Sequence, residues 1–220
     1  AGRRVHRRGG RCSNRRRRTA RWGHRRRAAG NRVCRWGALL MELLVPLAGL
    51  GAFGAVLLEL LLARLIRSGA ISRPEINLTI DIEAPRAAVW AYASDIARQP
   101  EWMHEMKRVE MLTPPPIQPG SRGRATVRIF GISTTDDVVI TRFDPPGTFA
   151  IRHESRFVGE GLLRFTAIDA SRTRVDWMEY LRPPLFAHLG GFVQRPILGA
   201  IFQSDLRHLK RILEAGPSAD

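Results

Sequence analysis

Cysteine is scarce in this chain: its 220 residues include only two, Cys12 and Cys34, and none follows Cys34. A disulfide framework is therefore excluded for most of the sequence, which must be held together by an ordinary apolar core. The first 36 residues also lack Lys, Asp and Glu, and no Met precedes Met41. They contain 15 Arg, against a formal net charge of +16 for the whole chain. The positive charge is thus local, and we do not expect the rest of the chain to bind nucleic acid.

Residues 1–36 combine Arg, Gly, Ala and His with few apolar side chains, a composition that predicts a disordered segment. Three interpretations of its role are open. The segment is encoded upstream of a true start near Met41, or it is an Arg-rich arm that binds phosphate groups of nucleic acid or lipid. The third interpretation is an export signal in which paired arginines precede an apolar run.

Residues 39–62 form a long apolar run, interrupted only by Glu42, Pro46 and Glu59. At about 1.5 Å per residue such a helix reaches about 36 Å, enough to cross a hydrocarbon core of about 30 Å. Both Glu side chains then lie near the interfaces, where the cost of a charge is smallest. We therefore predict a transmembrane helix over residues 37–66. A cleaved signal peptide is the alternative, although no clear small-residue cleavage site precedes Arg64.

The charges beside this helix predict the side of the membrane on which the remaining chain lies. Arg64, Arg67 and Arg73 follow the helix and indicate a single-pass protein whose globular domain is cytoplasmic. The Arg-rich segment, if it is part of the protein, competes with these residues and would reverse the topology. Residues 67–74 are expected to form a linker, and no pattern predicts an oligomeric state.

Residues 75–216 have the pattern of an α+β domain. Apolar and polar side chains alternate over residues 76–83, which predicts a strand with one buried face. Pro85 suits the first turn of a helix that continues to Asp95, and a second short helix is expected before residue 107. Further strands are predicted over residues 108–113, 122–130, 135–143, 148–157, 161–168 and 172–181, separated by the turns PPPIQPG, FG, DPPG, VGEG and DASR.

A long amphipathic helix, with an apolar stripe from Ile197 to Leu213, closes the domain before Gly216 and Pro217. Because the connections between strands are short, neighbouring strands should pair antiparallel. The last helix is the only element large enough to cover one face of a seven-stranded sheet. The predicted fold is therefore a curved sheet wrapped round the C-terminal helix, with two short helices after the first strand and a cavity between sheet and helix.

Four stretches resemble the START-like superfamily, also called Bet v 1-like or SRPBCC, and within it the polyketide cyclase/dehydrase group. They are INLTIDIEAPRAAVWAYASDIARQPEWM, ITRFDPPGTFAIR, SRTRVDWMEY and LRHLKRILE, and the similarity covers about residues 75–214. The resemblance implies a helix-grip fold with an internal cavity. It also implies a wide range of functions, since the superfamily includes lipid carriers, hormone receptors, aromatases, cyclases and chaperone activators.

Signals for catalysis are few. The domain has no cysteine, no Ser-x-Gly elbow, no His-Glu-x-x-His pair and no Gly-rich phosphate loop, so we expect neither a metal nor a cofactor. Strand parity places His153 on a face with Phe149 and Ile151, and Glu179 on a face with Trp177, which we take as the inward faces. These two residues are the candidates for general acid and base; the alternative is that each lies at the cavity mouth or satisfies a backbone group.

Aromatic and Met side chains suit a lipophilic ligand. The predicted ligand-binding residues are Trp90, Trp102, Met103, Met106, Ile151, His153, Phe165, Trp177, Glu179, Phe192, Ile197 and Ile201. The predicted function is binding or transport of a hydrophobic small molecule or lipid beside the membrane, without turnover. One alternative is a cyclase, dehydrase or aromatase-like enzyme acting through His153 and Glu179, and another is a protein-interaction module with a filled interior.

Overall fold

The computed structural model of the chain describes residues 20–129, 131–155 and 158–215. The chain divides into two compact units, Ala1–Ala55 and Val56–Asp220. The second unit holds the sheet and all helices after α1, and it contains every residue of the candidate site.

The first helix, α1, covers Ala20–Arg67 and includes Pro46. Residues 20–36, which we expected to be unstructured, are therefore helical; Arg and Ala are good helix formers and extend a helix that the apolar run begins. The rest of the Arg-rich segment, residues 1–19, lies outside the described residues. Within α1, Leu44–Arg67 is long and apolar enough to cross a membrane, and none of that stretch is buried in the protein.

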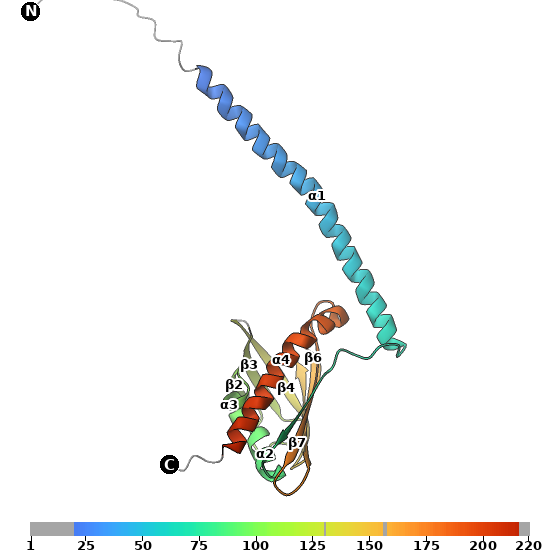
Figure 1. Ribbon diagram of the computed structural model, residues 1–220, viewed down its shortest axis with the longest axis vertical. Helices are drawn as coiled ribbons and strands as arrows, with labels where there is room; N and C mark the ends of the chain where they lie inside the picture. The colour runs from blue at the N-terminus through green and yellow to red at the C-terminus, as the bar shows by residue number, and fades with distance from the viewer. Residues whose placement is uncertain (1–19, 130, 156–157, 216–220) are drawn as a thin grey trace, which may run out of the picture. The chain divides into compact units, whose positions relative to one another are not determined.

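Seven strands form one antiparallel sheet in the spatial order β1-β7-β6-β5-β4-β3-β2 (Figure 1). Every connection except that from β1 to β2 joins neighbours in the sheet, so the strands from β2 to β7 form the predicted meander. The strands are β1 (Ile76–Ile82), β2 (Met106–Met111), β3 (Arg122–Ile129), β4 (Ile132–Asp144), β5 (Thr148–Glu154), β6 (Val158–Ala167) and β7 (Thr173–Arg182).

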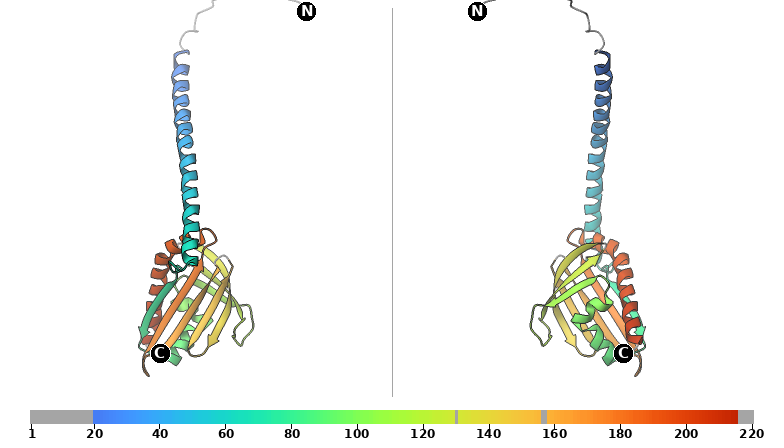
Figure 2. Two further views of the ribbon diagram at one scale, coloured as in Figure 1. Left: turned by 90° about the vertical axis from the view of Figure 1, so that its right-hand side faces the viewer. Right: turned by 90° about the vertical axis from the view of Figure 1, so that its left-hand side faces the viewer.

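The remaining helices lie where the sequence predicted them. Between β1 and β2 the chain forms α2 (Arg86–Ala93), the 3-10 turn η1 (Ile96–Arg98) and α3 (Gln99–Trp102). The last helix, α4 (Ala187–Glu214), crosses the open side of the curved sheet (Figure 2). The helix-grip prediction is thus confirmed: a seven-stranded antiparallel sheet, a long C-terminal helix, two short helices after the first strand, and a separate N-terminal apolar helix.

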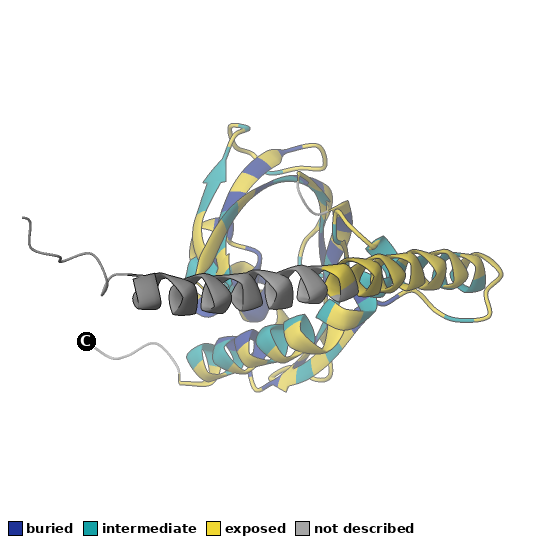
Figure 3. Ribbon diagram, turned by 90° about the horizontal axis from the view of Figure 1, so that it is seen from above, coloured by how far each residue is buried: buried dark blue, intermediate teal, exposed yellow. Residues whose placement is uncertain are grey.

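Buried and exposed positions alternate along the strands, as a sheet with one covered face requires (Figure 3). The core is built from the inward positions of the sheet and from α2, α3 and α4; Ile82, Val89, Trp102, Leu206 and Leu209 are completely buried. This core fills one end of the space between sheet and α4, and a cavity occupies the rest.

The sequence VGEG does not form the predicted turn, because it belongs to β6. Both of its glycines are needed for close packing. A Cβ at Gly159 would collide with the carbonyl oxygen of Tyr180, and one at Gly161 would lie 2.6 Å from Oε2 of Glu179. Glycine here permits close approach rather than a reversal of the chain.

Candidate functional site

A cavity of about 480 Å³ lies between the inner face of the sheet and α4. Its wall is built mainly from alternate residues of neighbouring strands, which strand parity places on one face. Most of these side chains are apolar, among them Val127, Ile140, Phe149, Ile151, Leu163 and Phe202. The cavity is large enough for a small apolar molecule. An interaction module was expected to have a filled interior, whereas this domain has a cavity.

His153 on β5 lies between two carboxylates in the cavity wall. Its Nε2 is 3.0 Å from Oε1 of Glu179, and its Nδ1 is hydrogen-bonded to Oδ2 of Asp136. Oε2 of Glu179 accepts a hydrogen bond of 3.0 Å from the indole N–H of Trp177. Since each ring nitrogen faces a carboxylate oxygen, the imidazole donates from both nitrogens and is held as an imidazolium. We call Asp136, His153 and Glu179 the His153 cluster.

The His153 cluster depends on a residue without a side chain. His153 is on β5 and Glu179 on β7, and β6 lies between these two strands. The position on β6 between them is Gly161, which pairs with Ile151 on one side and Glu179 on the other. A Cβ at this position would collide with the Glu179 carboxylate. Gly161 therefore leaves the space through which Glu179 reaches across to His153.

Two opposing effects set the protonation of His153. Burial disfavours the charged imidazolium, but the hydrogen bonds to Asp136 and Glu179 and the charges of both carboxylates outweigh it, and raise the pKa of His153 to about 9. The cluster therefore holds one positive charge between two carboxylates at neutral pH. Neither ring nitrogen is left free to exchange a proton with a molecule in the cavity.

A second polar group lies in the wall, at Asp205 of α4. Its side chain is almost completely buried, and Oδ1 accepts hydrogen bonds from the backbone N of His104 at 3.1 Å and from its Nδ1 at 3.0 Å. Burial raises the pKa of Asp205 to about 6, although the hydrogen bonds from His104 act in the opposite direction. The ring of His104 stacks on that of His208, with centroids 4.5 Å apart. Glu105, the neighbour of His104, also lines the cavity.

The structure places seven of the twelve predicted ligand-binding residues in the cavity wall. They are Met103, Met106, Ile151, His153, Trp177, Glu179 and Ile197. The inferred strand parity for β5 and β7 therefore holds, and His153 and Glu179 face each other.

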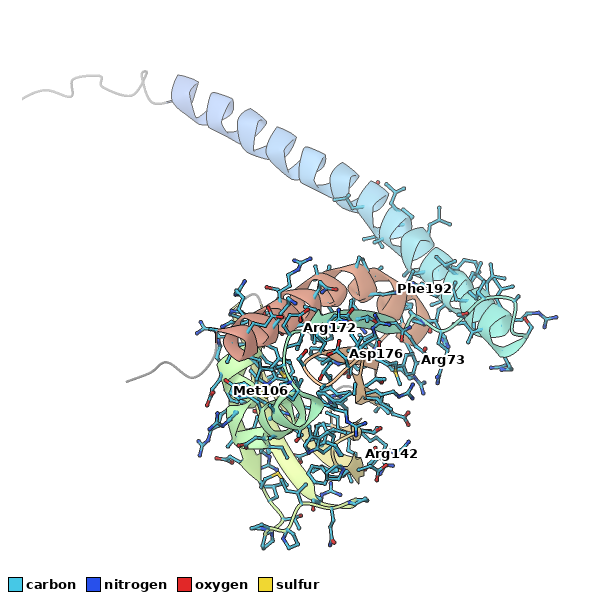
Figure 4. The ribbon with its side chains drawn as sticks, turned by 60° about the horizontal axis from the view of Figure 1, so that its bottom comes forward. Arg73, Met106, Arg142, Arg172, Asp176 and Phe192 are labelled. Carbon is cyan, nitrogen blue, oxygen red and sulfur yellow. The ribbon has the colours of Figure 1, made fainter. Side chains whose placement is uncertain are left out.

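The other five predicted residues do not line the cavity. Trp90 and Phe165 pack against each other in the core with ring centroids 5.4 Å apart, and Trp102 packs edge-on against Trp177. Ile201 is half-buried on α4 and does not line the cavity. Phe192 is also on α4 (Figure 4). It lines a separate hollow with Leu58 and Leu62. Their apolar character predicted burial, but it could not distinguish packing in the core from contact with the cavity.

Three acidic wall residues were missed from the sequence: Asp136, Asp205 and Glu105. Asp136 lies two positions along from Val138, which pairs with His153 across β4 and β5. The signal was available for this residue, since Thr134, Asp136, Val138 and Ile140 alternate along one strand and all line the cavity. Asp136 was missed because STTDDVV contains two adjacent aspartates, only one of which can face inward, and the sequence does not tell which.

The alternating arginines Arg122 and Arg124 of β3 lie on the outer face. Arg124 binds Asp137 through two hydrogen bonds of 2.7 and 3.2 Å, and Arg122 binds Glu154 at 2.9 Å. Within the described residues, no group of three His, Cys, Asp or Glu side chains has an arrangement that could hold a metal ion.

Several solved structures have the same fold as the domain in the second unit. The protein TTHA0849 from Thermus thermophilus matches with a TM-score of 0.56 and 20% identity over 66% of this chain and 100% of its own. A START superfamily protein from Mycobacterium smegmatis matches with a TM-score of 0.54 and 16% identity, over 64% of this chain and 97% of its own. The Zhui aromatase/cyclase from Streptomyces sp. R1128 matches with a TM-score of 0.50 and 20% identity, over 64% and 97%.

These three chains consist almost wholly of the matching domain, so a helix-grip domain of this kind folds without a segment such as α1.

No curated protein sequence matches this chain. The family model described as "Polyketide cyclase / dehydrase and lipid transport" matches residues 73–214, which is more than half of the chain. The chain therefore belongs to the polyketide cyclase/dehydrase and lipid transport family.

Proposed function

We propose that this protein binds an apolar small molecule in the cavity of a membrane-tethered domain and does not convert it chemically. The observation that carries the proposal is the cavity of about 480 Å³, whose wall is mainly apolar. Ligand sites in proteins commonly enclose about 300–1,000 Å³ and are lined by apolar side chains with a few placed polar groups. The cavity has both properties.

The arrangement of the His153 cluster supports binding without turnover. A general acid or base needs a nitrogen or oxygen that can reach the reacting atom. Both nitrogens of His153 are engaged by carboxylates, and both oxygens of Glu179 accept hydrogen bonds, from His153 and from Trp177. The cluster is therefore satisfied internally at these positions, and its groups are better suited to shaping the cavity wall than to moving protons.

The topology favours entry of the ligand from the membrane. Of the residues that line the cavity, the exposed ones are Ile132 and Ile197, so the opening lies at the end of the sheet where β4 begins. The opening is thus not at residues 96–106, the segment that leads from α2 into β2. Because Ile76 pairs with Glu179, β1 begins at the end where β7 finishes, which is this same end. The linker from α1 therefore joins the domain beside the cavity opening.

The linker is short. Between Arg67 and Ile76 a fully extended chain spans at most about 30 Å, since each residue adds about 3.3–3.6 Å. Glu59 of α1 adds a direct contact, because its carboxylate accepts hydrogen bonds from the backbone N of His188 at 3.0 Å and of Leu189 at 2.8 Å. These two donors are in the first turn of α4. If Leu44–Arg67 spans a membrane, the linker keeps the start of β1 within about 30 Å of the end of the span.

Exposed apolar side chains surround the same end of the domain. Leu185, between β7 and α4, is 76% exposed, and Ile132, the first residue of β4, is 72% exposed. Val158, Phe186 and Val193 are exposed at this end as well. Exposed apolar groups of this kind mark contact surfaces for membranes or partners. We propose that they face the bilayer, and that Arg64, Arg67 and Arg73 keep the domain on the cytoplasmic side.

Native mass spectrometry of the isolated domain, residues 68–215, purified without detergent tests the proposal. Glu59 is absent from this fragment; among the described residues its hydrogen bonds outside α1 go to the first turn of α4, and it is not one of the residues that line the cavity. The expected result is a co-purified apolar molecule at near-stoichiometric level that is recovered unchanged after incubation. An apo mass, with no thermal shift from a panel of lipophilic compounds, would overturn the proposal.

The second candidate function is an enzyme of the cyclase, dehydrase or aromatase type. The observation that favours it is the approach of His153 and Glu179 in the wall of the cavity, at 3.0 Å. The fold is also that of the Zhui aromatase/cyclase. If the molecule identified by mass spectrometry is consumed by the wild-type domain and not by His153→Gln or Glu179→Gln, the enzyme replaces the carrier as the function.

A further inference from the structure

The wall of the cavity carries an uneven set of charges. Four carboxylate residues line it, namely Glu105, Asp136, Glu179 and Asp205, and all four are buried or half-buried. His153 is the only basic residue among the lining residues that the structure describes, and these include no Lys or Arg. The chain as a whole has 36 Lys and Arg against 20 Asp and Glu, so the cavity has the opposite charge balance to the protein.

Two oxygens of these wall residues lack a donor. Oδ1 of Asp136 and Oε2 of Glu105 are buried and accept no hydrogen bond from the part of the chain that the structure describes. The Asp136 side chain is only 10% exposed. A buried carboxylate oxygen without a donor is costly, and a group that donates a hydrogen bond to it lowers that cost. Both oxygens are enclosed by protein, so a donor in the cavity reaches them only when the side chains turn, and they add to the negative character of the wall.

The single positive charge in the wall does not offer an anion site. Both N–H groups of His153 already donate to Asp136 and Glu179, so a carboxylate or phosphate in the cavity would find no free imidazolium donor. It would instead lie among four acidic side chains in an apolar cavity, where like charges repel more strongly than in water.

We propose that the ligand is an apolar molecule whose polar group donates hydrogen bonds and carries no negative charge, such as a hydroxyl or an amine. The cavity accordingly rejects fatty acids and other anionic amphiphiles of the same chain length. This inference rests on the proposed binding function and names the chemical class of its ligand. Repulsion by the wall carboxylates gives selectivity, and the apolar wall gives affinity.

The test compares three probes with one chain length: 1-decanol, decylamine and decanoate. Each displaces a neutral fluorescent apolar dye from the isolated domain at pH 7.4, below the concentration at which it aggregates. The expected result is that decanol and decylamine bind at least tenfold more tightly than decanoate. In the Asp136→Asn, Glu105→Gln double variant, the affinity for decanoate should rise at least fivefold.

The matched control is Asp137→Asn, on the outer face of the same strand, which should leave all three affinities unchanged. Equal affinities of the wild-type domain for the three probes, or a preference for decanoate, would overturn the inference while the binding function stands. Failure of the dye and of all three probes to bind would overturn the proposed function itself. The ranking of the three probes is measured on the wild-type domain, so it holds as a test even if the double variant does not fold.

Discussion

Asp136 and Asp137 are adjacent in the sequence and lie on opposite faces of β4. Asp137 faces outward and forms a two-point ion pair with Arg124, one of several Arg–carboxylate pairs on the outer face. Asp136 faces inward, is hydrogen-bonded to His153, and has one oxygen without a donor from the described residues. The Asp137 carboxylate is in contact with solvent beside the Arg124 guanidinium. The Asp136 carboxylate lies in an apolar wall together with other acidic side chains.

The difference shows that the two faces of one sheet use charge for different purposes. On the outer face, solvent-exposed ion pairs contribute little to stability and keep the surface soluble. On the inner face, each buried charge depends on its partners, because water cannot replace a partner that is lost. Changes to the inner cluster should therefore have large effects, and the corresponding changes outside should have small ones.

Removal of the central cation should have the largest effect. His153→Ala leaves the Asp136 and Glu179 carboxylates facing each other without the imidazolium, and breaking a buried pair in this way typically costs about 3–5 kcal/mol. We expect the free energy of unfolding of the isolated domain to fall by that amount in urea at pH 7. A loss below about 1 kcal/mol would mean that the cluster is not an ion network and would weaken the contrast between the faces.

The pH dependence of stability should follow from the raised pKa of His153. Because the folded pKa of about 9 exceeds the ordinary value of 6.5, this stabilisation is fully present below pH 6.5 and is lost as pH rises through about 9. The shift corresponds to an upper value of about 3 kcal/mol. Urea unfolding of the wild-type domain between pH 7 and 10 should show the loss.

Asp205 does not interfere with that measurement. Burial raises its pKa to about 6, so its contribution to the free energy of unfolding is lost as pH rises through 6. That change is complete below the range of pH 7–10 used for His153. The His153→Gln variant is the control and should lack most of the decline between pH 7 and 10. An equal decline in wild type and variant would assign it to other groups.

Filling the space that Gly161 leaves on β6 should have an intermediate effect on the free energy of unfolding. Gly161→Ala places a Cβ 2.6 Å from Oε2 of Glu179, so the carboxylate must move away from His153. We expect a loss of about 1–3 kcal/mol, as for other overpacking changes, and a lower pKa of His153 by NMR titration. The control is Gly147→Ala, whose nearest neighbour would be the carbonyl oxygen of Asp144 at 3.6 Å, an ordinary contact. An unchanged His153 pKa in Gly161→Ala would show that Glu179 does not reach across β6.

The smallest effect is expected on the outer face. Arg124→Ala removes an exposed partner of Asp137, and the carboxylate that remains is hydrated by solvent. The urea midpoint at pH 7 and 0.15 M salt should not change measurably. A shift comparable with that of His153→Ala would remove the distinction between the two faces.

The fold could be predicted from local patterns because each of its elements has a strong one. The alternation in β1, the Ala-Pro junction before α2 and the apolar stripe of α4 each predict one element, and short connections limit the topology. The VGEG segment is the exception. Its glycines serve contacts with Glu179 and Tyr180, residues about twenty positions away, and no local pattern reports such a contact.

The site was only partly predictable, for a related reason. Strand parity was enough to place His153 and Glu179 on the inner face, because it is a local property of each strand. Asp205 is on α4 and meets His104 only through tertiary packing, so its place in the wall has no sequence signal. The division of aromatic residues between core and cavity, as for Trp102 and Trp177, likewise depends on how α4 packs on the sheet.

We propose above all that the cavity holds an apolar molecule and leaves it unchanged. Native mass spectrometry of the detergent-free domain, followed by extraction and identification of any bound compound before and after prolonged incubation, tests it most directly. We expect one bound apolar compound per domain, with a hydroxyl or amine and no acidic group, and with the same mass after incubation. An empty domain that no lipophilic compound stabilises, or a bound compound converted to a product, would contradict it.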